Sequence, residues 1–315
     1  MKVISISNSY PDNYMLFEPS YHFSRVREMG CELFECFDSQ SVFEFGNSAD
    51  VILLSAHDDL WPAFWDEISD YIKDLQTFVG IFSIDSYRNI WHRGRKPIRF
   101  DALFPSMNAI YKEYMVMLGY DCRYAFFSTC CVDVQVSNNI KDIDILVWGN
   151  NGLPSYPFRN FVVRELTRYS ISESVKGELI CNKLLLGSHE WSYARLPYHN
   201  LGYWGDSLYD LLGRSKISIT GSGAINAPIA KYFQNAACGC VTITTDFSDR
   251  AELGFEHGKN IWITKEDSFI KDLAFLLEND DLVNEMAVNA GQLIADHHTV
   301  KIRSLQLEKF LEKMI

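Results

Sequence analysis

The stretch KISITGSGAINAPIAKYFQNAACGCVTIT (216–244) combines two short runs of β-forming residues with a helical pattern between them. A loop of small residues follows the first run, and a single glycine, Gly239, joins the helix to the second run. Two strands connected through a helix are typical of a parallel sheet, because parallel neighbours need a long crossover connection. The stretch therefore predicts an α/β fold.

The same alternation of strand and helix patterns continues along nearly the whole chain. Expected strands of the first half lie at 2–7, 31–37, 50–55 and 78–84, with helices at 20–30 and 62–75. Expected strands of the second half lie at 142–149, 179–187, 216–220, 240–244 and 260–264, with helices at 158–170, 207–215 and 268–280. A polar stretch, VSNNIKD (136–142), separates the two series and suits a linker. We therefore predict two Rossmann-like α/β domains facing each other across a cleft.

The expected N-terminal domain spans residues 1–140, and the expected C-terminal domain spans residues 141–299. Residues 300–315 form a predicted helix that could cross back to the N-terminal domain. In open parallel sheets, ligands bind beyond the carboxyl ends of the strands. The loops that follow strands are therefore the places where a site is expected, and the loop at 220–226 is one of them.

The composition is that of a globular protein. Of the 315 residues, 47% are hydrophobic and 22% are charged, which leaves enough apolar side chains for a sizeable core. The net charge of −12 disfavours a general nucleic-acid binder, because such proteins normally carry a basic surface. No apolar run is long enough to span a membrane, and the first one is too short for a signal peptide. The eight cysteines form no CxxC pair, so a reduced, cytoplasmic protein is expected.

The loop after the strand at 216–220 has the composition of an anion-binding turn. Gly221 and Gly223 allow a tight turn, and Asn226 is the predicted N-cap of the following helix, with Pro228 in its first turn. A small-residue loop at a helix N-terminus presents N–H groups to an anion, typically a phosphate. The loop lacks the GK[ST] ending of a Walker A motif and the GxGxxG spacing. From these residues alone, phosphate binding and an ordinary strand-to-helix turn are both open.

The helix that follows carries three polar side chains on one side. Lys231 lies three residues before Gln234 and four before Asn235, so that these side chains are neighbours on the helix surface. Phe233 and Ala236 can point toward a core. A solvated helix face and a ligand-binding face both fit this pattern.

Three motifs contain groups that could bind a metal ion. DID (142–144) matches the DxD pattern of metal-dependent sugar transferases, but it precedes a strand, so Asp142 is expected to be solvated. HDD (57–59) follows a strand but has a common loop composition, and DHH (296–298) lacks a third spaced ligand and suits a structural role. We therefore expect neither a metal site nor a cofactor.

Taken in order, the motifs of the second half resemble the C-terminal domain of GT-B glycosyltransferases, in particular the CgeB-like branch near the large GT4 group (glycosyl transferases group 1). The resembling segments are DILVWGNNGLPSYPFRNFVVREL (144–166), LLLGSHEW (184–191), NLGYWGDSLYDLLGRSKISIT (200–220), KYFQNAACGCVTIT (231–244), DFSDRAELGFEHGKNIWI (246–263) and ADHHTVKIRSLQLEKFL (295–311). Two segments of the first half, 82–89 and 101–134, agree with the family more loosely.

This resemblance implies a nucleotide-sugar donor bound mainly by the C-terminal domain and an acceptor bound by the N-terminal domain. In the family motif R-x-F-E, the glutamate reaches the ribose hydroxyls of the donor. Here Gln234 holds that position and can still hydrogen-bond hydroxyls, although without a charge. Lys231 replaces the arginine and would meet a phosphate as a point charge.

The resemblance, together with the positions of loops after strands, implies a donor site and two candidate catalytic residues. The predicted donor-binding residues are Gly149, Asn150, His189, Tyr203, Trp204, Ser222, Gly223, Lys231, Gln234 and Asn235. Lys231 and the N–H groups of residues 222–224 would stabilise the leaving diphosphate without a divalent cation, and Tyr203 and Trp204 would contact the base. Asp85 and His57, each after an N-terminal strand, are the candidates for activating the acceptor hydroxyl.

The leading prediction is a metal-independent glycosyltransferase that uses a nucleotide-sugar donor, with UDP as the preferred carrier. The acceptor is open between a surface polysaccharide or other glycan, a protein and a small molecule. Neither nucleic acid nor a membrane span is expected. A catalytically silent nucleotide-sugar-binding protein of the same fold is the alternative, motivated by Gln234. A two-domain periplasmic solute receptor is disfavoured by the absence of a signal-peptide pattern and by the scattered cysteines.

Overall fold

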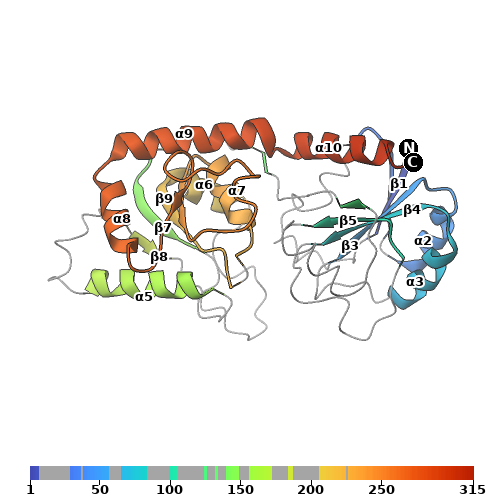
Figure 1. Ribbon diagram of the computed structural model, residues 1–315, viewed down its shortest axis with the longest axis horizontal. Helices are drawn as coiled ribbons and strands as arrows, with labels where there is room; N and C mark the ends of the chain where they lie inside the picture. The colour runs from blue at the N-terminus through green and yellow to red at the C-terminus, as the bar shows by residue number, and fades with distance from the viewer. Residues whose placement is uncertain are drawn as a thin grey trace. The chain divides into compact units, whose positions relative to one another are not determined.

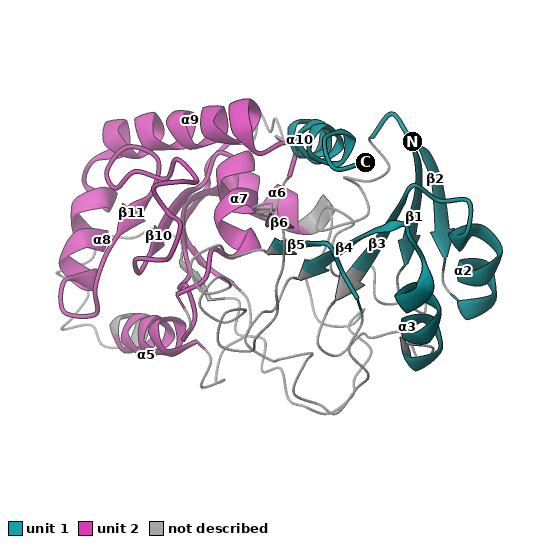
Figure 2. Ribbon diagram, turned by 45° about the vertical axis from the view of Figure 1, so that its right-hand side comes forward, with its two compact units in different colours: residues 1–131, 300–315 teal, residues 132–299 magenta. Residues whose placement is uncertain are grey.

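The computed structural model describes residues 1–6, 29–36, 38–56, 65–83, 99–105, 124–125, 132–133, 140–148, 156–171, 184–186, 206–224 and 226–315. The chain divides into two compact units (Figure 2). Unit 1 comprises residues 1–131 and 300–315, and unit 2 comprises residues 132–299. The division therefore falls a few residues before the boundary that the sequence places at 140/141. The predicted helix at 20–30 lies largely outside the described residues.

Unit 1 is built on a parallel sheet with the strand order β2-β1-β3-β4-β5-β6 (Figure 2). The strands are β1 (Lys2–Ile6), β2 (Glu32–Cys36), β3 (Val51–Ala56), β4 (Phe78–Ser83), β5 (Ala102–Pro105) and β6 (Tyr124–Ala125). The helices of this unit are α2 (Ser39–Gly46), α3 (Trp65–Asp74) and α10 (Val300–Glu312). The sequence patterns at 2–7, 31–37, 50–55 and 78–84 thus correspond to β1, β2, β3 and β4.

The unit 1 sheet is apolar on both faces, which explains why its strands read as continuous hydrophobic runs. Ile4 and Ile6 of β1 pack in one core cluster with Ile68 of α3. Val3, which points to the opposite face because strand side chains alternate, packs in a second cluster with Leu307 of α10. The C-terminal helix of the chain therefore contributes to the core of the N-terminal unit.

Unit 2 is built on a second parallel sheet, with the strand order β11-β10-β9-β7-β8. Its strands are β7 (Ile143–Val147), β8 (Leu184–Leu186), β9 (Ser215–Ile219), β10 (Val241–Thr244) and β11 (Trp262–Ile263). Its helices are α5 (Pro157–Ile171), α6 (Asp206–Arg214), α7 (Ala230–Ala237), α8 (Phe269–Leu277) and α9 (Asp280–His297). The quoted stretch 216–244 therefore forms the β9–α7–β10 crossover that the sequence predicts (Figure 1).

The two faces of the unit 2 sheet are covered by different helices. Ile145 of β7 packs with Val162 of α5 and with Phe269 of α8 in one core cluster. Leu146, the next residue of β7, packs with Leu212 of α6 in the other. Among the described residues, no helix is long and apolar enough to cross a membrane.

Candidate functional site

The candidate site lies at the carboxyl ends of β7 and β9, which are neighbours in the unit 2 sheet. Val147 at the end of β7 pairs with Ile219 at the end of β9, so that Trp148 and Thr220 leave the sheet side by side. The loop after β9 leads into α7. This is the edge of a parallel sheet at which ligands bind in open α/β folds.

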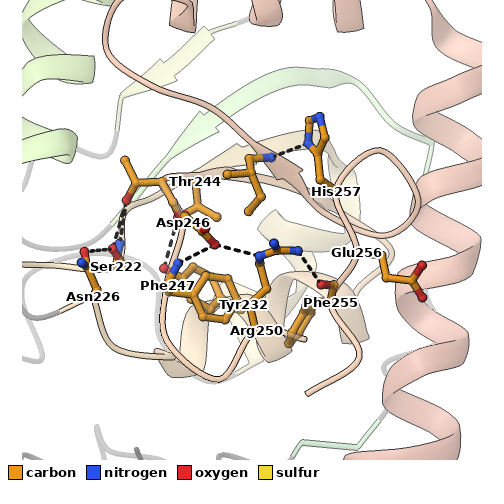
Figure 3. Close-up of polar contacts among 12 residues, drawn as sticks. Ser222, Asn226, Tyr232, Thr244, Asp246, Phe247, Arg250, Phe255, Glu256 and His257 are labelled. Atoms are coloured by element: carbon orange, nitrogen blue, oxygen red, sulfur yellow. Dashed lines mark hydrogen bonds and ion pairs between the residues drawn. The ribbon is translucent and has the colours of Figure 1, made fainter. Parts of the chain in front are cut away.

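The loop between β9 and α7 is held in shape by its own side chains. The buried hydroxyl of Ser222 donates to Asn226 Oδ1 at 3.2 Å and lies 3.0 Å from Thr245 Oγ1 (Figure 3). Gly223 has a φ of 73° and Asn226 a φ of 52°. Both values lie in the left-handed region, which glycine adopts freely and asparagine adopts more readily than most residues. The amino acids at these two positions therefore suit the backbone that the loop requires.

Asn226 is not the helix N-cap that the sequence predicts. α7 begins at Ala230, after Ile229 in extended conformation, and no side chain caps it. The left-handed backbone of Asn226 turns the chain before a helix can start, and its side-chain oxygen accepts from Ser222 instead of from the helix. The N–H groups at the start of α7 consequently have no side-chain cap.

The backbone N–H groups of the loop are not equivalent. The N–H of Ser222 points to Thr245 Oγ1 at 3.5 Å, and the residue is only 2% exposed. Within the described part of the chain, the N–H groups of Gly223 and Ala224 are bonded to no acceptor. Residues 223 and 224 are therefore better placed than Ser222 to present N–H groups to an anion.

Lys231 and Asn235 of α7 both contact Trp148. The ammonium of Lys231 lies 3.4 Å from the centroid of the Trp148 ring. A cation–π contact of this kind contributes about 0.5–2 kcal/mol. Asn235 is completely buried, accepts a hydrogen bond from Trp148 Nε1 at 3.3 Å, and donates to Thr242 Oγ1 at 3.0 Å. Lys231 and Asn235 therefore lie on the same side of α7, as predicted. Asn235 is buried, however, and would have to become exposed before it could contact a donor directly.

A second cation lies close to Lys231. Arg159 at the start of α5 is 1% exposed, donates to Thr220 Oγ1 at 3.2 Å, and lies 4.4 Å from the centroid of the Tyr156 ring. Desolvation lowers the pKa of Lys231 well below its usual value, and the positive charge of Arg159 lowers it further. Among the described residues, no carboxylate lies within ion-pair distance of Lys231. The site therefore places two cations near each other and is suited to an anion.

An aromatic cluster packs against α7. Phe255 packs edge-on against Phe233 at a centroid distance of 5.4 Å and contacts Phe247, Tyr232 and His298. The Tyr232 hydroxyl lies 3.1 Å from Thr244 Oγ1, and the Tyr232 ring stacks on Phe247 at a centroid distance of 4.4 Å.

Polar contacts fix the segment around Phe255. The Phe255 carbonyl accepts a hydrogen bond from Arg250, which is paired with Asp246 (Figure 3). His298 of the DHH motif bonds the Leu253 carbonyl at 2.9 Å, which gives it the structural role that the sequence predicts.

The acids of the DID motif are engaged in ion pairs. Asp142 accepts two hydrogen bonds of 2.8 Å from Arg214, and Asp144 lies 3.4 Å from Lys216 Nζ. Asp142 is exposed, as expected, and it also pairs with Arg214 because the end of α6 brings that residue beside it. Within the described ranges, no three His, Cys, Asp or Glu side chains are grouped as metal ligands would be.

Several predicted site residues lie outside the described part of the chain, so their roles stay predictions. They are His57, Asp85, Gly149, Asn150, His189, Tyr203 and Trp204. Of the remaining five, Ser222 and Gly223 form part of the loop after β9, and Lys231 and Asn235 contact Trp148. Gln234 is half-buried on the same helix.

Trp148 and Arg159 were not among the predicted site residues. Trp148 carried one usable signal, which is its place at the carboxyl end of the strand predicted at 142–149. Arg159 shares a helix face with Val162 and Leu166, at spacings of three and seven residues, and both of those are completely buried. A charged residue on an apolar stripe is the signal that indicates a buried functional cation.

Two parallel-sheet α/β units, the second with an anion-suited loop at the carboxyl ends of its strands, are the architecture of the GT-B class. The sequence profile of the glycosyl transferase-like family matches residues 138–309, which is more than half of the chain. The chain therefore belongs to the glycosyl transferase-like family and is a glycosyltransferase, as the sequence predicts. This match does not distinguish the CgeB-like branch, which stays a prediction.

Solved structures with the same fold include three that cover nearly the whole chain. Anabaena HepE in complex with UDP and glucose is 11% identical, with a TM-score of 0.65 and coverage of 99% of this chain and 100% of that one. Sucrose-phosphate synthase from Thermosynechococcus elongatus is 7% identical, with a TM-score of 0.63 and coverage of 100% and 99%. A glycosyltransferase from Rickettsia africae is 8% identical, with a TM-score of 0.59 and coverage of 99% and 98%. At these identities the likeness concerns the fold. No curated protein matches the sequence.

Proposed function

We propose that this glycosyltransferase transfers a sugar from a UDP-linked donor to an acceptor hydroxyl. The observation that carries the proposal is the contact of Lys231 with Trp148, which leaves the same sheet edge as the loop after β9. In that loop the N–H groups of residues 223 and 224 are bonded to no described acceptor. Arg159 adds a second positive charge near Lys231. HepE, whose fold this chain shares, has been solved with UDP and with UDP-glucose, which supports UDP as the carrier.

The proposed chemistry follows from where charge develops during transfer. The bond between the sugar C1 and the β-phosphate oxygen breaks, the acceptor oxygen bonds to C1, and the leaving UDP gains negative charge. Lys231 and the N–H groups of Gly223 and Ala224 would stabilise that charge. Gln234 would bond the ribose hydroxyls, and Asp85 or His57 would take the proton of the acceptor hydroxyl. Asn235 would act indirectly, because it is buried against Trp148.

A nucleotide panel tests the carrier. UDP is expected to raise the thermal midpoint of the protein more than GDP, ADP or dTDP does at equal concentration, because a ligand that binds the native state stabilises it. Differential scanning fluorimetry across a concentration series measures the shift. The proposal of a UDP site would be rejected by a larger shift with another nucleotide, or by no shift with any of them.

A catalytically silent nucleotide-sugar-binding protein is the second candidate. Gln234 favours it, because the family motif has glutamate at that position. Release of UDP from UDP-sugars, followed with a set of glycan, protein and small-molecule acceptors, separates the two. Tight UDP binding without turnover under any of these conditions would support the silent protein.

We propose that the transfer needs no divalent cation. The proposal is supported by Lys231 and the nearby charge of Arg159, which would supply positive charge to the diphosphate in place of a metal ion. EDTA is therefore expected to leave the rate of UDP release unchanged, and added Mn²⁺ or Mg²⁺ is expected to have little effect. Loss of activity in EDTA that Mn²⁺ or Mg²⁺ restores would contradict this proposal.

We further propose a cytoplasmic location and a role in the synthesis of a cell-surface glycan. The scattered cysteines support the location, and Cys31, Cys36, Cys238 and Cys240 are free thiols. Fractionation of cells that express a tagged protein tests the location.

A further inference from the structure

Trp148 is fixed in orientation by three different elements of unit 2. Its Nε1 donates to Ser218 Oγ of β9 at 3.2 Å and to Asn235 Oδ1 of α7 at 3.3 Å. Both acceptor residues are 0% exposed. The indole also packs against the core cluster that contains Leu212 of α6. The ring therefore has little freedom to turn.

Lys231 is held by this ring. Its ammonium lies 3.4 Å from the ring centroid. A lysine side chain has four rotatable stem bonds and loses considerable rotamer entropy when it is fixed in one position. The indole face supplies an attractive surface that favours one position of the ammonium.

An aromatic ring holds a lysine differently from a carboxylate. An aspartate or glutamate would neutralise the ammonium and would repel a phosphate. The face of an indole attracts a cation through its quadrupole and carries no net charge. Lys231 can therefore be held by Trp148 while its positive charge remains available to an anion.

We propose that Trp148 is a positioning residue for Lys231. The Trp148 ring, which is oriented by Asn235 and Ser218, holds the Lys231 ammonium in place to receive the diphosphate of the donor. This inference rests on the proposed function and adds to it the residue that places the phosphate-binding cation. Trp148 acts through the lysine and does not itself need to touch the donor.

A double-mutant cycle measures whether Trp148 acts through Lys231. We expect Trp148→Leu to weaken UDP binding up to about tenfold in isothermal titration calorimetry, because a lysine that is no longer held in place must be ordered when UDP binds. In the Lys231→Ala background the same substitution is expected to have no further effect. Trp148→Phe, which keeps an aromatic face but loses the indole N–H, should restore most of the affinity.

Trp262 of β11 provides the matched control. It lies outside the site and packs against His257 and Phe275. Trp262→Leu removes an indole from the same unit and is expected to leave UDP affinity unchanged. The proposal would be overturned if Trp148→Leu weakened UDP binding equally with and without Lys231, because Trp148 would then act independently of the lysine.

NMR spectroscopy tests the contact between Lys231 and Trp148 in the free protein. With ¹³C-labelled lysine, the ring current of Trp148 should shift the side-chain proton signals of Lys231 upfield. That cross peak should disappear in Lys231→Ala, move to the ordinary lysine position in Trp148→Leu, and stay in place in Trp262→Leu. An unmoved signal in a folded Trp148→Leu variant would refute the positioning role.

The UDP affinity of Lys231→Ala tests the proposed function separately from the role of Trp148. Unchanged UDP affinity in Lys231→Ala alone would remove the diphosphate assignment, whatever the cycle shows. If Lys231→Ala loses UDP affinity and Trp148→Leu has the same effect in both backgrounds, the proposed function stands and the role of Trp148 is rejected.

Discussion

Lys231→Ala is expected to weaken UDP binding by about 1.5–3 kcal/mol, the range for a hydrogen bond to a charged group. This corresponds to a loss of affinity of roughly 10- to 150-fold. The reason is that Lys231, held over Trp148, is the cation that the proposed function assigns to the diphosphate. Isothermal titration calorimetry with UDP measures the change.

Two variants control this experiment. Lys271→Ala removes an exposed lysine from α8 and should leave UDP affinity unchanged. Lys231→Arg keeps the positive charge, restores the residue of the family motif, and should retain more affinity than Lys231→Ala. Wild-type affinity in a correctly folded Lys231→Ala protein would show that Lys231 does not bind the diphosphate.

The contribution of Lys231 to UDP affinity should decrease as pH rises. Desolvation and Arg159 lower the pKa of Lys231 in the free protein, and a bound diphosphate would raise it. In the pH interval between the two values, binding takes up a proton. Below this interval the lysine is charged in both states and its contribution is greatest, and it declines as pH rises through the interval. The difference in affinity between wild type and Lys231→Ala, measured across pH, isolates this effect.

Phe255→Ala is expected to destabilise unit 2 by about 3–5 kcal/mol, the usual cost of truncating a buried phenylalanine. Phe255 is 1% exposed and joins α7, through Phe233 and Tyr232, to His298 at the end of α9. For a unit of this size the thermal midpoint should fall by roughly 6–20 °C. Scanning calorimetry, in which the two units can unfold as separate transitions, measures the change.

Phe275→Ala is the matched control for this substitution. Phe275 lies on α8 and is 43% exposed, so its truncation creates little cavity. The midpoint of that variant should stay close to the wild-type value. Equal midpoints for Phe255→Ala and wild type would mean that the aromatic cluster does not support α7 in the way inferred from its packing.

The fold could be predicted because its signal is local. Runs such as 2–7 and 216–220 are apolar along their whole length, and strands covered on both faces produce this pattern. The small-residue loop and Gly239 marked both ends of α7 approximately. The start of α7 was wrong because the left-handed conformation of Asn226 depends on hydrogen bonds that it accepts from Ser222 and from Ser248, residues separated from it by four and by 22 positions.

The site could be predicted only in part. Lys231 and its neighbours were found from helical spacing and from the family motif. Asn235 was assigned to the donor because spacing gives the side of a helix but not what covers it. Arg214 pairs with Asp142 across 72 positions of sequence, a contact that no local pattern reveals.

Sequence patterns alone were enough to predict two parallel-sheet α/β units, membership among glycosyltransferases, and the placement of Lys231 and Gln234 on one helix after a glycine-containing loop. The surroundings of Lys231 follow from the fold. Trp148 contacts it from the end of β7, and Arg159 at the start of α5 carries a positive charge that acts on it, because parallel strands bring their carboxyl ends to the same edge of the sheet. Local sequence specifies hydrophobic period and backbone preference, whereas the charge environment of a side chain depends on residues that only the folded sheet brings together.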